Sequence, residues 1–295
     1  MRANEHMTGS QRQSRSTARS ERIDERFGGS DGPSPHWTRT LAGAGRLIMT
    51  DDSLRLGLEG ATATRYSDAQ IDDYSHLPAS RYLWRPPLRM RVRARASHAA
   101  HPAAATAGAS DPWLRGTAGF GFWNAPFTLA GGGLRAPEAV WFFAASPPSN
   151  MALTVGGTGY GWKAQVVHTH RREALAAAGP LALSALWARL SGDARPAERW
   201  MQRLTGAREQ PLDAERADLR QWHEYTLEWA PDFARFAVDG STVLIAPDPP
   251  RGPLGFVAWI DNQYAVATPR GDLRFGALDC PPQWLDLATL VIEPM

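Results

Sequence analysis

The segment Trp222 to Gly240, WHEYTLEWAPDFARFAVDG, restricts the fold of this chain more than any other stretch. Apolar and polar residues alternate from His223 to Trp229, which is the period-two pattern of a β-strand with one buried side. The letters APD then supply turn residues, and the alternation resumes in FARFAV before a DG pair turns the chain again. The segment therefore predicts two antiparallel strands joined by a tight turn.

The same alternation recurs along the chain. Leu88 to Ala96, LRMRVRARA, places apolar residues on one face and four arginines on the other. Such a ladder is typical of a solvated sheet face, and a specific anion site is the alternative. Aromatic strands are expected within residues 116–127 and 139–145, and a closing strand over 285–293. Many short strands with frequent turns predict an all-β fold of two stacked antiparallel sheets, a jelly-roll sandwich.

Two stretches break this pattern. Residues 1–35 are polar and nearly free of large apolar groups, so we expect a disordered tail followed by one domain over residues 36–295. Within residues 171–220, apolar residues recur at helical spacing, and Pro196 and Gly206 suit the ends of a helix. These residues predict a helical hairpin inserted in the β domain, with a third short helix over 212–219. The insertion either packs on its own sheet, covers a binding site as a lid, or contacts a protein partner or membrane surface.

Composition excludes several classes of function. The net charge of the 295 residues is only +2, so we expect no nucleic-acid partner. The single Cys280 excludes an intrachain disulfide framework and a multi-cysteine zinc site. No run approaches the roughly 18 consecutive apolar residues of a transmembrane helix. The N-terminal segment has no apolar stretch of the kind found in secretory signals, so a cytoplasmic location is expected.

The strand pair WHEYTLEWAPDFARFAVDG resembles that of concanavalin A-like lectin/glucanase domains, especially the family 16 glycoside hydrolases. GTAGFGFWNAPF resembles the aromatic segment that lines the sugar cleft of that family, and PLGFVAWIDNQYA stands where the family has a late cleft strand. DLATLVIEP resembles the closing strand. The resemblance extends from about residue 40 to residue 295 and implies a concanavalin A-like jelly roll with a cleft on one sheet.

The sequence departs from the family where the catalytic residues are expected. Family 16 enzymes carry E-x-D-x-x-E on one cleft strand, and a retaining glycosidase needs two carboxyl groups about 5–5.5 Å apart. The corresponding segment here is PEAVWFFAAS, in which Glu138 is present but Val140 and Phe143 occupy positions where carboxylates are expected. Hydrolysis by the family mechanism is therefore not expected, and whether the chain is an enzyme stays open.

Sugar-binding sites stack aromatic rings on sugar C–H faces and fix hydroxyl groups with Asn, Asp and Gln. We expect Trp259, Asp261 and Gln263 on one strand face, with Trp123 and Asn124 on the neighbouring aromatic segment. The resemblance implies that both segments approach the concave side. The alternative is that both tryptophans belong to the core and that Asp261 ends a strand. The first hypothesis is thus binding of a carbohydrate or another small ligand.

Two other hypotheses remain. A glycoside hydrolase-like enzyme would use a different set of titratable groups, for which Glu138, Asp261 and His223 are the candidates. A protein-partner module would use the helical insertion instead.

Metal and cofactor signals are few. We expect no metal site, because His168 and His170 lack an identified third ligand. Asp72 and Asp73 are expected to cap a turn, and a structural calcium site is the alternative. The sequence predicts no other cofactor.

Overall fold

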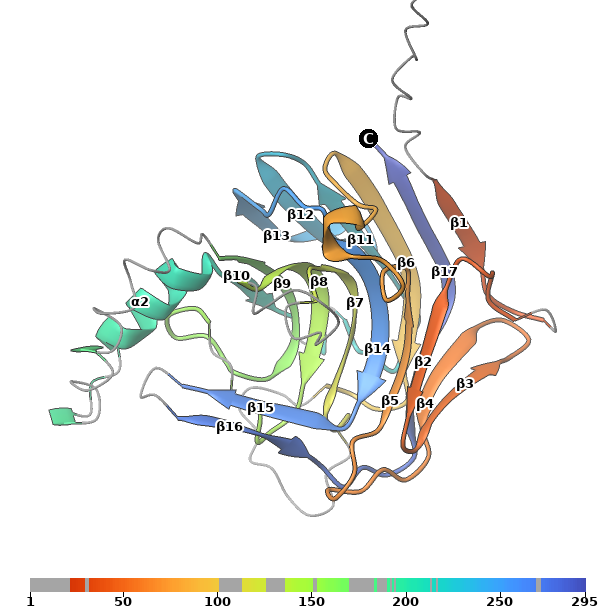
Figure 1. The fold of residues 1–295 in the computed structure, drawn as a ribbon, viewed down its shortest axis with the longest axis horizontal. Helices are drawn as coiled ribbons and strands as arrows, with labels where there is room; N and C mark the ends of the chain where they lie inside the picture. Colours follow the sequence, from red (N-terminus) through yellow and green to blue (C-terminus); the bar gives the residue numbers. More distant parts are fainter. Residues whose placement is uncertain are drawn as a thin grey trace, which may run out of the picture.

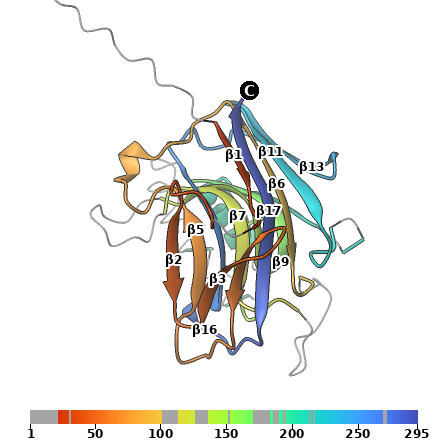
Figure 2. The same ribbon diagram turned by 90° about the vertical axis from the view of Figure 1, so that its right-hand side faces the viewer.

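The computed structural model describes residues 22–29, 32–100, 113–125, 136–150, 153–169, 183–184, 190–191, 193, 195–212, 214–215, 217–268 and 272–295. Two large antiparallel sheets stack on one another, as Figures 1 and 2 show from two directions. The prediction of a two-sheet antiparallel sandwich of the jelly-roll kind is confirmed.

One sheet has eight strands. In spatial order it contains β13 (Ser241–Pro247), β12 (Phe233–Val238), β11 (His223–Trp229), β6 (Leu88–Ala96), β17 (Gln283–Pro294), β4 (Leu54–Leu58) and β3 (Gly45–Met49), with β1 (Ile23–Arg26) paired to β17. The predicted strand pair within residues 222–240 is present as β11 and β12. Their register pairs Tyr225 with Val238 and Leu227 with Phe236.

The other sheet has seven strands. In spatial order it contains β10 (Arg208–Pro211), β9 (Gly161–His168), β8 (Glu138–Ala145), β7 (Thr117–Trp123), β14 (Gly255–Asp261), β5 (Asp68–Asp72) and β2 (Thr38–Ala42). A separate pair, β15 (Gln263–Ala267) and β16 (Leu273–Ala277), follows β14, and a short 3-10 helix η1 spans Ala79–Arg81. Apolar residues that alternate along both sheets meet between them and form one large core, which includes Phe120, Phe142 and Tyr225.

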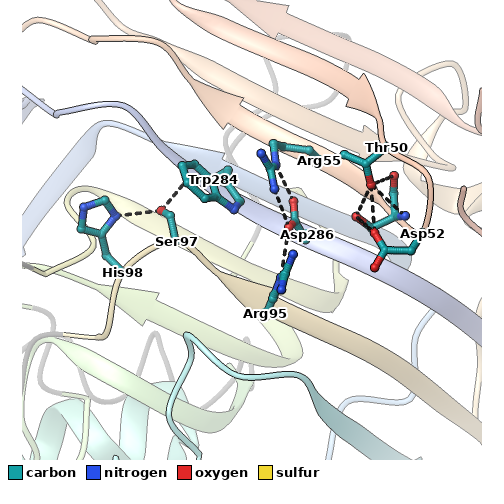
Figure 3. Close-up of polar contacts among 9 residues, drawn as sticks. Thr50, Asp52, Arg55, Arg95, Ser97, His98, Trp284 and Asp286 are labelled. Carbon is teal, nitrogen blue, oxygen red and sulfur yellow. Dashed lines mark hydrogen bonds and ion pairs between the residues drawn. The ribbon is translucent and has the colours of Figure 1, made fainter.

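The outward face of the eight-stranded sheet carries the arginine ladder of β6. Arg89, Arg91 and Arg95 bind acidic side chains of neighbouring strands, and Arg93 lies over the ring of Trp222, as expected for a solvated sheet face. Asp286, whose side chain is fully buried, accepts hydrogen bonds from Arg55 at 2.7 and 2.9 Å and from Arg95 at 3.3 Å (Figure 3). Arg55 also lies over the ring of Trp284, with its guanidinium carbon 4.3 Å from the ring centroid.

Three expectations need correction. The domain begins before residue 36, because Ile23–Arg26 pairs with β17 and Phe27 is buried in the core. The described residues of 212–219 form turns and loops instead of a third helix, since Leu212 and Leu219 are held in the inter-sheet core. Of the predicted hairpin, the structure describes one full helix, α2 (Arg195–Thr205); most of the first helix lies outside the described residues.

Candidate functional site

Alternate residues of the seven-stranded sheet point away from the core and form what we call the outer face. Strand register arranges them in rows across the sheet. One row runs Glu209, Gln165, Trp141, Gly121, Val257 and Asp72. The next row runs Lys163, Phe143, Gly119, Trp259 and Gln70, and the third runs Ala145, Thr117, Asp261 and Asp68. Aromatic groups thus lie in the middle of this face, between polar groups on both flanks.

Four rings make up the central cluster, which we call the aromatic platform: Trp123, Trp141, Phe143 and Trp259. Trp141 contacts all three others, with ring centroids 5.8 Å from Trp123, 5.4 Å from Phe143 and 5.3 Å from Trp259. Trp123, Trp141 and Phe143 are partly exposed, and Trp259 is 8% exposed. The platform is therefore a surface layer on the outer face, separate from the inter-sheet core.

Each tryptophan of the platform is held by its indole N–H. Trp123 Nε1 donates to the Tyr74 hydroxyl at 2.7 Å, Trp141 Nε1 to Gln165 Oε1 at 2.8 Å, and Trp259 Nε1 to Thr117 Oγ1 at 2.9 Å. A buried indole N–H needs such a partner. These bonds fix the ring edges and leave stacking as the interaction that the ring faces offer.

Two glycines of β7 make room for the rings. A Cβ atom at Gly119 would collide with the carbonyl oxygen of Phe142 and lie 2.9 Å from Cη2 of Trp259. At Gly121, where φ is +148°, a Cβ atom would lie 2.6 Å from both Cα and Cβ of Trp141. The GTAGFGFW segment therefore carries glycine at these positions because aromatic residues from both neighbouring strands occupy the space above its backbone.

A buried polar network borders the platform on the side of β9 and β10. Glu209 Oε2 accepts hydrogen bonds from Gln165 Nε2 at 2.9 Å and Lys163 Nζ at 3.1 Å, while Glu209 Oε1 accepts one from Thr154 Oγ1 at 2.7 Å. The side chains of Lys163 and Glu209 are each only 2% exposed. Because Gln165 also accepts from Trp141, this ion pair fixes the position of the central ring.

A pair of carboxyl groups borders the platform on the opposite side. Asp261 of β14 stands directly opposite Asp68 of β5 in the antiparallel register, and both belong to the outer face. Asp261 Oδ1 accepts hydrogen bonds from Thr117 N at 3.2 Å, Thr117 Oγ1 at 2.9 Å and Gln263 N at 2.9 Å. Asp68 is 3% exposed, and its Oδ1 is buried without a hydrogen-bond partner among the described residues.

Burial raises the pKa of both carboxyl groups, because removal from water disfavours the charged form. The pKa of Asp261 rises to about 6, against the opposing effect of its three hydrogen-bond donors. The pKa of Asp68 rises well above its usual range through burial and through repulsion from Asp261. This side of the platform therefore holds two buried carboxyl groups whose pKa values are both raised.

The structure brings some of the predicted ligand residues together. Trp123 and Trp259 lie in the platform, and Asp261 follows Trp259 on the same strand face. Asn124 does not join them: its Nδ2 donates to the Ala136 carbonyl and its Oδ1 accepts from Glu138 N. Gln263 is exposed on β15, because the strand ends at Asp261 and the chain enters a separate sheet.

The predicted titratable residues do not share one site. Glu138 begins β8, opposite His168, at the far end of the sheet from Asp261. His223 lies on the eight-stranded sheet, where its Nδ1 is 2.6 Å from Asp239 Oδ2. The expected carboxylate positions on β8 also need correction, since Val140 points into the core and the outer face receives Ala139, Trp141, Phe143 and Ala145.

The acidic pair at the end of β5, Asp72 and the following Asp73, divides between the two faces. Asp72 Oδ1 accepts from the N–H groups of Tyr74 and Ser75, which is the turn capping that the sequence predicts. Asp73 faces inward and accepts from Trp84 Nε1 and Phe256 N. Among the described residues, no three His, Cys, Asp or Glu side chains are placed to bind one metal ion.

Sequence reasoning missed Asp68 and the residues of the polar network as parts of this face. A period-two signal was present, because Asp68, Gln70 and Asp72 alternate with Ala69 and Ile71. The partnership with Asp261 depends on register between strands nearly two hundred residues apart, which no local pattern encodes.

The helical insertion meets the outer face through α2. Met201 packs against a small buried cluster that contains Val167 and Ala139, and Trp123 and Trp141 of the platform pack against the same cluster. The exposed side of α2 carries Arg195, Arg199 and Arg203 at a spacing of four residues. In the part of the chain that the structure describes, no helix is both long and apolar enough to span a membrane.

No family model and no curated protein matches this chain in sequence. The chain is similar in structure to the β-glucanase of Bacillus licheniformis, with 11% identity and a TM-score of 0.47 over 93% of this chain and 98% of that one. It is also similar to the exoplasmic/lumenal domain of VIP36 in a Ca²⁺/Man2-bound form, with 12% identity and a TM-score of 0.45 over 93% and 87% of the two chains. A third similar structure is an endo-acting O-glycanase of the human gut microbiota, with 10% identity and a TM-score of 0.49 over 92% and 98%. A glucanase and a mannose-bound domain therefore stand among the similar structures, and conclusions about function depend on the residues of this chain.

Proposed function

We propose that this chain binds a carbohydrate on the outer face of its seven-stranded sheet, without hydrolysing it. The observation that carries the proposal is the aromatic platform, in which three tryptophans and Phe143 contact one another on the protein surface. Such rings bury the apolar C–H faces of sugars, while polar groups at the border bind hydroxyl groups. The polar network of β9 and β10 and the carboxyl pair of β5 and β14 supply those borders.

The residues of β8 support the non-hydrolytic part of the proposal. This strand crosses the middle of the outer face, and the residues that it presents there are Ala139, Trp141, Phe143 and Ala145. None carries a carboxyl group, so a sugar lying across these rings meets no acid or nucleophile from the strand beneath it.

The test is a glycan array followed by calorimetry with the glycans that bind. Trp141→Ala and Trp259→Ala should each weaken binding by about five-fold, since one aromatic contact contributes about 1 kcal/mol. Trp222→Ala is the matched control, because Trp222 is a partly exposed tryptophan that directly precedes β11 and lies against Arg95 of the eight-stranded sheet. Absence of binding to every glycan, or equal affinity in all three variants and the wild type, would contradict the proposal.

One observation favours a second candidate, a glycoside hydrolase-like activity. Asp261 and Asp68 place two carboxyl groups on opposed residues of the outer face, and burial raises the pKa of both, whereas glycoside hydrolysis commonly uses a pair of carboxyl groups with separated pKa values. Incubation of glycans that bind, with detection of new reducing ends, separates the two functions. Release of reducing ends by the wild type but not by Asp261→Asn would establish the enzyme and contradict simple binding.

A further inference from the structure

Asp68 and Asp261 are directly opposed residues of neighbouring antiparallel strands. Such residues have Cβ atoms about 4.5–5.5 Å apart. Two carboxyl groups at this separation, shielded from water, do not both ionise readily because their charges repel. The pair therefore retains a proton at pH values where two separate aspartates would both be ionised.

Hydrogen bonding decides which residue carries the charge. Asp261 Oδ1 receives three donors, two from Thr117 and one from the Gln263 N–H, and donors of this kind stabilise a carboxylate. Asp68 accepts one side-chain hydrogen bond, from Tyr66, and its buried Oδ1 receives no donor from the described residues. Asp261 is therefore the ionised member of the pair, and Asp68 is the protonated one.

The charged group is connected to the aromatic platform. Trp259 precedes Asp261 by two residues on the same strand face, so the two side chains stand about 7 Å apart along β14. Trp259 Nε1 donates to the Thr117 hydroxyl, which in turn donates to Asp261 Oδ1. Asp261 is 6% exposed, and its Oδ2 accepts no hydrogen bond from the described residues. A carboxylate oxygen without a hydrogen-bond partner among the described residues thus lies beside the last ring of the platform.

The described residues around the pair do not supply a compensating cation. The other titratable groups that influence the pair or lie against it are Tyr66, Asp72, Cys280 and Arg115. Burial raises the pKa of Tyr66 and raises the pKa of Cys280 to about 12, so both stay neutral at physiological pH. Arg115 acts on Cys280, and neither aspartate forms an ion pair with a described cation.

Building on the proposed function, we propose that Asp261 is a pH-dependent polar anchor of the platform, with Asp68 as its protonated partner. The Asp261 carboxylate accepts a hydrogen bond from a hydroxyl group of an uncharged sugar that stacks on Trp259. A hydrogen bond to a charged acceptor is roughly twice as strong as one to a neutral acceptor, so acidification weakens the site. Among the described strand positions of the outer face, Lys163 is the one cation and is paired with Glu209, so an anionic sugar is disfavoured.

Calorimetry across pH tests this proposal. The probes are neutral β-glucan and mannose oligosaccharides, with alginate oligosaccharides as the anionic probe. The affinity for a neutral probe should fall about five-fold between pH 7 and pH 5, with a midpoint near the Asp261 pKa of about 6. Asp261→Asn should bind more weakly at pH 7 and should lose most of this pH dependence.

Asp73→Asn is the matched control. Asp73 is also buried and has a pKa raised to about 7, but it faces the inter-sheet region, where it binds Trp84 and the Phe256 N–H. This variant should retain the pH profile of sugar binding. A profile that disappears in Asp73→Asn and persists in Asp261→Asn would overturn the assignment.

A measurement without ligand covers the case in which a variant does not fold. Carboxyl ¹³C shifts of aspartate-labelled wild-type protein should show one outer-face carboxyl that titrates near pH 6 and another that stays protonated at higher pH. Two carboxyls that both ionise near pH 4 would refute the anchor. Binding that does not depend on pH, or that favours alginate, would overturn this inference alone, whereas absence of all glycan binding would overturn the proposed function as well.

Discussion

Asp73→Asn should destabilise the protein at acid pH but leave it equally or more stable than the wild type at mildly alkaline pH. Asp73 is 1% exposed, and burial raises its pKa to about 7 from an ordinary value of 3.8. A carboxyl group whose pKa is raised in the folded state makes its full contribution to the free energy of unfolding below the pKa of the unfolded state. This contribution is lost as the pH rises from about 4 through about 7, because the unfolded chain releases its proton first.

The size of this loss follows from the shift. One pKa unit corresponds to about 1.4 kcal/mol, so a rise from 3.8 to about 7 corresponds to about 4 kcal/mol. Asparagine has no such titration, but its amide replaces one of the two oxygens that accept from Trp84 Nε1 and Phe256 N. The lost acceptor costs about 1–3 kcal/mol at every pH. The variant should therefore be less stable than the wild type at pH 4 and equally or more stable at pH 8.

Urea denaturation followed by circular dichroism at several pH values between 4 and 8 measures this difference. The free energy of unfolding of the variant minus that of the wild type should rise by about 4 kcal/mol across the range. Asp232→Asn, at an exposed turn between β11 and β12, is the control and should show no such trend. A difference that stays constant from pH 4 to pH 8 would refute the assignment of a buried, neutral Asp73.

Three further changes test the site and its surroundings. Gly119→Ala should displace Trp259, because the new methyl group meets the indole ring, and glycan binding measured by calorimetry should become weaker. Unchanged binding would contradict the packing role of this glycine. Glu209→Ala should lower the free energy of unfolding, measured by urea denaturation, by about 3–5 kcal/mol, because it leaves the buried Lys163 unpaired. The double variant Lys163→Met/Glu209→Leu should lower it much less, because both charges are removed together. Asp286→Ala should lower the free energy of unfolding in urea by about 2 kcal/mol, because it removes the acceptor that Arg55 and Arg95 share. A loss below about 0.5 kcal/mol would show that those arginines need no partner.

The sequence predicted the fold where burial imposes a simple period. Leu88–Ala96 alternates because one face of β6 packs in the core and the other meets acidic side chains and solvent, and β11 follows the same rule. The register of these strands is then set by the need to keep the apolar set inside.

The candidate site was predicted only in part, for two physical reasons. Trp123 and Trp259 were recognisable as aromatic strand residues, but the central role of Trp141 depends on contacts among three strands. The phase of β8 was misjudged because its residues are apolar on both faces, so a one-residue error moves Val140 from the core to the surface without violating the pattern. Gln263 was misplaced because a strand end after Asp261 leaves no strong sequence signal.

The glycines at positions 119 and 121 restrict how this face can change. Neighbouring aromatic residues fill the space above both glycines, so β7 cannot contribute a side chain there without displacing a ring. New hydrogen-bonding groups for a ligand therefore have to come from the flanks. One flank, around Gln165, is locked by an ion pair, whereas the other, around Asp261, ends in a carboxylate oxygen without a described protein partner. Variation in ligand preference is thus expected to concentrate on β14, β5 and the loops that leave them, while the platform itself stays constant.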